Sequence, residues 1–61
     1  MSNVPELMSV ATFCKLFSVG RTTFYREVQE GRIRLRKQGT ASRVSREDAL
    51  AWMNNLPIIQ N

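Results

Sequence analysis

The spacing of apolar residues near the start of the chain predicts a first helix over residues 10–17. Apolar side chains fall there at positions i, i+3, i+4 and i+7, which form one face of a helix, and Leu16 widens that face. Ser9 stands directly before this segment, and its hydroxyl can accept a hydrogen bond from a free N–H of the first turn. The face that this helix would bury consists of Val10, Phe13, Cys14 and Phe17.

A second helix is predicted over residues 21–30, after a connection of only three residues, 18–20. Phe24 and Val28 form its apolar face at i, i+4 spacing, and the glycine at position 20 can serve as its N-cap. Gly31 follows at the position where helices commonly end in a left-handed residue. Two short helices joined by so few residues make a candidate helix-turn-helix.

The period of the pattern changes from 3.6 to 2 after the second helix. Residues 32–36 alternate basic and apolar side chains, which predicts a half-buried strand. Residues 37–41 resemble a turn in which Gly39 takes a positive φ, and residues 42–44 can return as a second strand. In this hairpin the arginines would point outward, and the side chains that point inward would be Ile33, Leu35 and Val44.

A third helix is predicted to begin after Ser45, which can cap it, with Asp48 placed to return a hydrogen bond in a weak capping box. Trp52 is the largest apolar side chain of this helix and is the expected core anchor, and Pro57 ends the pattern. The apolar positions of the helix are Ala49, Trp52, Met53 and Leu56.

These elements predict a mainly α fold with a small β-hairpin, a winged helix-turn-helix of three helices and a two-stranded wing. A chain of 61 residues has room for one domain, expected over residues 1–61 with its core at about 6–56. A domain of this size buries only about 60% of the surface that its unfolded chain exposes.

The charge of the chain is concentrated in the second helix and the hairpin. The net charge is +4 and the pI is about 10.3, which is typical of a nucleic-acid binder. Between Gly20 and Arg46, inclusive, lie eight basic residues and only two glutamates, whereas the rest of the chain has one lysine and three carboxylates. The two glutamates, Glu27 and Glu30, are expected to aid solubility or to pair within the helix, as Arg26 and Glu30 can.

The second helix carries side chains suited to contact bases and phosphates. Arginine forms two hydrogen bonds with guanine, glutamine does so with adenine, and the threonine methyl contacts thymine. The N–H groups at a helix N-terminus can also hold a phosphate. The helix positions that face away from Phe24 and Val28 are Arg21, Thr22, Tyr25, Arg26 and Gln29, and the candidate wing contacts are Arg34, Arg36 and Lys37.

The composition argues against several other classes of protein. The chain has no histidine and one cysteine, so it lacks the usual zinc ligand sets and any Ser-His-Asp or Cys-His arrangement. Cys14 is expected to be a small core residue. No apolar run approaches the roughly 20 residues of a membrane span, and the N-terminal residues do not resemble a secretion signal. We expect no enzyme activity, cofactor or metal, and a cytoplasmic setting such as a bacterial nucleoid or a phage-infected cell.

Several stretches of the chain together resemble the MerR-like excisionase family of small winged-helix proteins. They are residues 6–10, 18–26, Gly31 and 42–52, within a similarity that covers about residues 6–56. Ser18 stands where that family usually has a turn glycine, and Gly20 where it has a serine or threonine cap. The resemblance implies a second helix in the major groove with contacts from Arg21, Thr22, Thr23, Tyr25 and Arg26, and a wing contact from Arg43.

The expected function is sequence-specific binding of double-stranded DNA, by a small transcription regulator or an excisionase, which is a recombination directionality factor. An integrase or RNA polymerase would be a further partner. The alternatives are a protein-interaction module on the same scaffold, such as an anti-repressor or inhibitor, and, less favoured, an RNA-binding module. Several copies are expected to associate on DNA. The apolar residues 57–59 are a candidate contact between copies, unless they pack back on the core.

Overall fold

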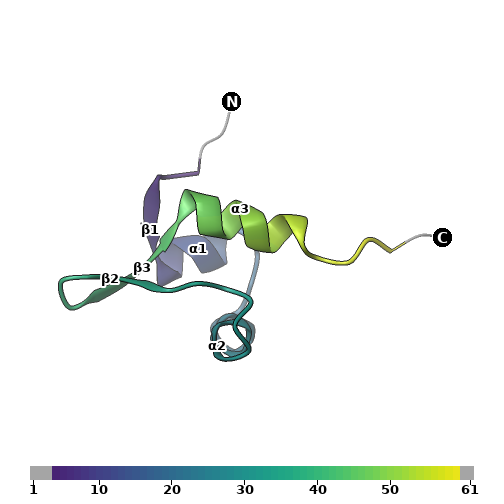
Figure 1. Ribbon diagram of the computed structural model, residues 1–61, viewed down its shortest axis with the longest axis horizontal. Coiled ribbons are helices and arrows are strands. Elements are labelled where there is room, and N and C mark those ends of the chain that lie inside the picture. Colours follow the sequence, from purple (N-terminus) through teal and green to yellow (C-terminus); the bar gives the residue numbers. More distant parts are fainter. Residues whose placement is uncertain (1–3, 60–61) are drawn as a thin grey trace.

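The computed structural model describes residues 4–59 and has a short strand, two helices, a hairpin and a third helix in that order (Figure 1). This architecture confirms the expected winged helix-turn-helix. One strand, β1, was not predicted, because three residues directly before a helix show no alternating pattern. The elements are β1 (Leu7–Ser9), α1 (Val10–Leu16), α2 (Arg21–Gln29), β2 (Arg36–Gln38), β3 (Ala41–Ser45) and α3 (Arg46–Asn54).

The helices begin where the capping residues predict. The hydroxyl of Ser9 accepts a hydrogen bond from the backbone N–H of Thr12 at 3.1 Å, and that of Ser45 accepts one from the N–H of Asp48 at 3.0 Å. Each serine satisfies a first-turn N–H that has no partner within its helix. Gly20 is the N-cap of α2 and provides no side-chain hydrogen bond.

Both helices of the helix-turn-helix end in a left-handed residue. Gly31 has φ +80° after α2, and Ser18 has φ +56° after α1. In each case the next residue donates its N–H to a carbonyl five residues earlier, at 2.9 Å, which is the hydrogen bond of a Schellman motif. Ser18 thus adopts a backbone conformation that favours glycine, which accounts for the glycine expected at this turn position.

The sheet has the order β1-β3-β2 and is antiparallel throughout, so β3 lies in its centre. The first wing strand was predicted at residues 32–36 but is formed by Arg36–Gln38. The reason lies at the end of α2, where the N–H groups of Arg32 and Ile33 both donate to the carbonyl of Glu27 and hold this segment to the helix. The turn of the hairpin includes Gly39, which has φ +62° as expected.

The core lies between α1, α2, α3 and one face of the sheet. Phe13 is at its centre, with ring centroids 5.2 Å from Phe24 and 5.5 Å from Trp52. Trp52 is only 7% exposed and is part of the core, as predicted. The remaining buried residues are Met8, Val10, Ile33, Val44 and Ala49, and Leu35 is partly buried against them.

Three residues predicted on the apolar faces of the first and third helices are instead exposed. Leu16 is 46% exposed, Met53 43% and Leu56 44%. The small core covers only one side of each helix, and residues 4–59 contain no further element that packs on the remaining apolar surface. Cys14 is partly buried next to the core, which agrees with its expected role as a small packing residue.

Candidate nucleic-acid interface

Helix α2 presents a hydrogen-bonding face to solvent. Phe24 is fully buried and fixes the rotation of the helix about its axis, so the other residues of its first turns point outward. The ring of Tyr25 lies edge-on to Phe24 with centroids 5.1 Å apart and is 49% exposed. The predicted contact residues of this helix are all exposed, namely Arg21, Thr22, Thr23, Tyr25 and Arg26.

The N-terminus of α2 has no side-chain cap, because its N-cap is Gly20. Apart from its own neighbours in the chain, no atom lies within 4 Å of the place where a Cβ on Gly20 would be, so this side of the helix end is open. The N–H groups of its first turn have no partner within the helix, and a helix N-terminus attracts anions. This end of α2 can therefore accept a phosphate, as the sequence predicts.

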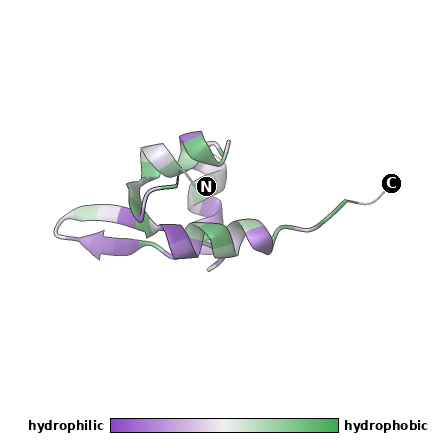
Figure 2. Ribbon diagram, turned by 90° about the horizontal axis from the view of Figure 1, so that it is seen from above, coloured by the Kyte–Doolittle hydropathy of each residue, from purple (hydrophilic) through white to green (hydrophobic). Residues whose placement is uncertain are grey.

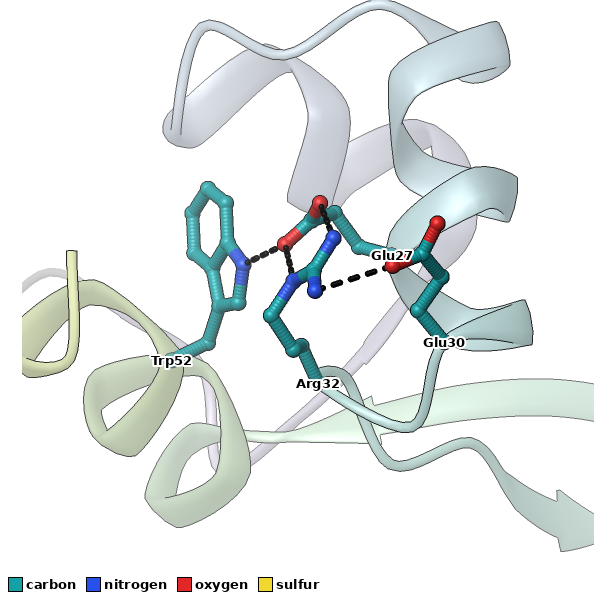
Figure 3. A network of polar contacts seen from close by, with 4 residues as sticks. All are labelled: Glu27, Glu30, Arg32 and Trp52. Carbon is teal, nitrogen blue, oxygen red and sulfur yellow. Dashed lines mark hydrogen bonds and ion pairs between the residues drawn. The ribbon is translucent and has the colours of Figure 1, made fainter.

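The opposite end of α2 is held by a network of polar contacts around Glu27 (Figure 3). Its carboxylate accepts two hydrogen bonds from Arg32, each at 2.8 Å, and a third from the indole N–H of Trp52 at 2.9 Å. Arg32 also pairs with Glu30 at 3.0 Å. The contacts from Arg32 and then from Trp52 lower the pKa of Glu27 to about 2. The network joins α2 to α3 and to the chain that enters the wing.

This network corrects the expectation for the two glutamates of α2. Neither Glu27 nor Glu30 forms an ion pair with Arg26. Both form ion pairs with Arg32 instead. A signal for the pairing was present in the sequence. A Schellman motif at Gly31 brings the residues at positions 27 and 32 together, and an apolar contact commonly forms there. In this chain an ion pair takes the place of that contact.

The hairpin of β2 and β3, together with residues 34 and 35 that lead into it, is called the wing below. Arg36 donates from Nε to Asp48 at 2.8 Å, which links the wing to the first turn of α3. This contact lowers the pKa of Asp48 and raises that of Arg36. Arg43 donates to Gln38 on the neighbouring strand at 3.0 Å. Of the predicted wing contacts, Arg36 thus has a carboxylate partner and Arg43 a neutral one.

The remaining basic residues fall into two groups. Arg46 pairs with Glu6 at 3.4 Å and donates to the carbonyl of Val4, so it ties α3 to the chain before β1. Other basic side chains form no ion pair within residues 4–59, and we call them the unpaired cations. They are Lys15, Arg21, Arg26, Arg34, Lys37 and Arg43.

All the unpaired cations except Lys15 lie on α2 or on the wing. Figure 1 shows α2 at the lower edge of the molecule and the hairpin projecting to one side, so both elements protrude from the core. Figure 2 shows strong hydrophilic colouring along one strand of the hairpin and mixed colouring along the other. The structure therefore brings the predicted contact residues onto two protruding elements that are neighbours in the chain.

A family model described as a helix-turn-helix domain matches residues 7–57, which is nearly the whole chain. The chain belongs to the helix-turn-helix domain family. This family includes excisionase-like DNA-binding proteins, and it indicates that the domain binds DNA. No curated protein and no solved structure matches the chain. Within residues 4–59, no helix of this helix-turn-helix domain is long and apolar enough to cross a membrane.

Proposed function

We propose that this helix-turn-helix domain recognises a specific sequence of double-stranded DNA, with α2 in the major groove. The observation that carries the proposal is the unpaired face of α2. Arg21 and Arg26 project from it without a carboxylate partner in the described chain, while Phe24 and the contacts of Glu27 fix the helix on the core. A rigid helix with free arginine side chains is suited to form bidentate hydrogen bonds with guanine.

The wing would contact the adjacent backbone or the minor groove. Arg34, Lys37 and Arg43 supply its positive charge, and phosphate contacts of this kind position a protein on DNA without selecting a sequence. Arg36 is occupied by Asp48 in the free domain. We assign it first the task of holding the wing against α3, and contact with DNA second.

The domain would act by occupying or shaping a DNA site, and the proposal includes no covalent chemistry. Two roles fit such an action, a small transcription regulator and an excision factor that directs site-specific recombination. RNA polymerase would be the partner in the first role and an integrase in the second. Both roles place the domain in a cytoplasmic, DNA-containing compartment.

Several copies are expected to act together on one DNA molecule. A single small module buries about 600–1,000 Å² on DNA and contacts only a few base pairs. This is a small basis for selecting one site in a genome. Residues 4–59 contain no long helix that could form a coiled-coil dimer. Association on neighbouring sites is therefore the proposed route to specificity.

Selection of duplexes from a random library, followed by filter binding to the selected and to a scrambled duplex, tests this function. We expect enrichment of a short motif and a preference for the selected duplex. The Arg21→Ala variant should show a smaller preference for the selected duplex, whereas Lys15→Ala, which removes an unpaired cation outside α2 and the wing, should keep the parental preference. Equal binding of both duplexes by the parent domain would contradict sequence-specific recognition. No duplex binding at all would favour the protein-interaction alternative.

A further inference from the structure

An apolar groove lies on the side of the domain formed by α1 and α3. It has a volume of about 450 Å³, and α2 and the wing contribute nothing to its lining. Leu16, Met53 and Leu56, the three residues that the core leaves exposed, all belong to it. The other lining residues are Val4, Phe17, Ser18, Leu50 and Trp52.

The chain after α3 carries the complementary feature. Ile58 is 83% exposed and Ile59 is 85% exposed, which makes them the two most exposed large apolar residues of the described chain. Both views show this segment continuing away from the end of α3 and from the body of the domain (Figures 1 and 2). The groove and the tail, residues 57–59, are therefore open in the same molecule.

We propose that the groove of one copy binds Ile58 and Ile59 of a second copy. The inference rests on the proposed function for its setting, since DNA would place the copies side by side. A tail that extends away from its own domain leaves that domain's groove free for a neighbour. Because neither groove nor tail includes a residue of α2 or the wing, the contact leaves the proposed DNA-binding residues accessible.

The size of the contact sets its strength. Stable protein interfaces bury about 1,200–2,000 Å² in total, and two isoleucines in one groove bury far less. The free domain is therefore expected to associate only weakly. Copies bound to neighbouring sites have an effective concentration on the order of millimolar, at which a weak contact produces strong cooperativity. The geometry thus favours a contact that forms mainly on DNA.

A mixing experiment tests the contact through one change in each partner surface. Met53→Lys places a charge in the groove and Ile59→Glu places the opposite charge in the tail. Each variant alone should lose cooperative binding to a long duplex of random sequence, by on the order of 10²-fold in the cooperativity factor. An equimolar mixture should recover it. Every junction in an alternating array then joins either two unchanged surfaces or a lysine groove and a glutamate tail.

The control is Leu7→Lys, which changes a 40% exposed leucine outside the groove and should leave cooperativity unchanged. Circular dichroism on Met53→Lys and Ile59→Glu should show parental folding, since both side chains are exposed. Parental cooperativity in either single variant would overturn the proposal. So would a mixture that remains non-cooperative, because that result places the tail on its own domain or on another surface.

Sedimentation of the free domain separates this inference from the proposed function. At millimolar protein without DNA, we expect weak self-association of the parent, monomers for each single variant, and self-association of the mixture. This result would support the groove even if the domain failed to bind duplex DNA. A parent that stays monomeric at that concentration and binds long duplexes without cooperativity would overturn the groove while leaving DNA recognition intact.

Discussion

Two groups of arginines in this domain have the same chemistry and different surroundings. Arg32 and Arg36 bind carboxylates of α2 and α3, whereas Arg34, which lies between them in the sequence, forms no ion pair in the described chain. On α2, Arg21 and Arg26 are also unpaired. The carboxylates therefore divide the basic residues into those that hold the elements together and those that remain available for an anion from outside.

The difference teaches that net charge alone does not locate the binding surface. Four of the chain's five acidic residues form the ion pairs with Arg32, Arg36 and Arg46. These ion pairs lie at the contacts between elements: at the end of α2 next to α3, between the wing and α3, and between α3 and the chain before β1. The unpaired cations of α2 and the wing lie outside these contacts, on the protruding elements.

The largest effect on stability is expected at the contact between α2 and α3. Trp52→Ala removes the core anchor and the indole donor to Glu27, and loss of a buried tryptophan destabilises a domain by about 3–5 kcal/mol. A domain this small has little more stability than that, so we expect the variant to be largely unfolded. Thermal denaturation followed by circular dichroism measures this. A melting temperature near that of the parent would show that Trp52 is dispensable for folding.

Substitution of the unpaired arginines of α2 should instead weaken DNA recognition. Arg21→Ala and Arg26→Ala should each weaken specific binding by about 1–3 kcal/mol and relax the preference at one base pair, with the fold unchanged. Competition titrations with selected and random duplexes measure both quantities. Equal losses on the two duplexes for both variants would remove α2 as the recognition helix.

Residues 32–36 offer the closest comparison, because paired and unpaired arginines alternate there. Arg34→Ala and Lys37→Ala should weaken binding to every sequence alike and reduce the slope of log affinity against log salt by about 1 each. Arg32→Ala should act on stability, since its side chain is engaged by two glutamates. Salt titrations combined with melting curves separate the two outcomes. If Arg32→Ala reduced the slope of log affinity against log salt as much as Arg34→Ala, the division into structural and DNA-contacting arginines would be wrong.

The smallest effect concerns pH. Because Arg32 and Trp52 lower the pKa of Glu27 from its ordinary value of 4.5 to about 2, the unfolded chain binds the proton more readily than the folded domain. The stability due to this carboxylate is fully present above pH 4.5 and is lost as the pH falls toward 2. Glu27→Gln should lower stability at neutral pH and flatten the decline in acid, as measured by urea denaturation at several pH values.

Lys37→Gln is the control for this measurement, since it removes a charge but no contact of Glu27, and it should keep the parental decline in acid. Arg32→Gln, which removes the partner, should flatten the decline as Glu27→Gln does. A parental acid profile in Glu27→Gln would mean that its carboxylate does not stabilise the fold.

The sequence predicted the elements whose signals are local. Ser9 and Ser45 mark helix starts because a cap needs only the next three residues, and Gly31 and Gly39 mark the positive φ values that they adopt. The exposed face of α2 followed from Phe24 and Val28, since two apolar residues at i, i+4 spacing fix which side of a short helix is buried. The contact residues could therefore be placed on their elements before the structure was known.

Features that depend on distant residues were missed. Strand β1 exists because Met8 pairs with Val44, and the pair of Arg36 with Asp48 forms only when the wing folds against α3. The wing strand was placed too early because alternation at residues 32–36 also arises in a non-strand segment whose residue 33 is buried. The exposure of Leu16 was missed because the width of an apolar face does not reveal how much of it the core covers.

The central position of β3 has a consequence for how the domain folds. Its pairing with β1 joins Leu7 to Ser45 and spans both helices of the helix-turn-helix, while its pairing with β2 is local. The β1–β3 ladder therefore closes only when α1 and α2 are in place, so we expect the domain to fold cooperatively. Amide protons in the β1–β3 ladder should exchange with solvent only upon global unfolding, and those of β2, whose pairing with β3 is local, much sooner. We therefore expect β3, the strand that carries the proposed DNA contact Arg43, to be among the last parts of the domain to open.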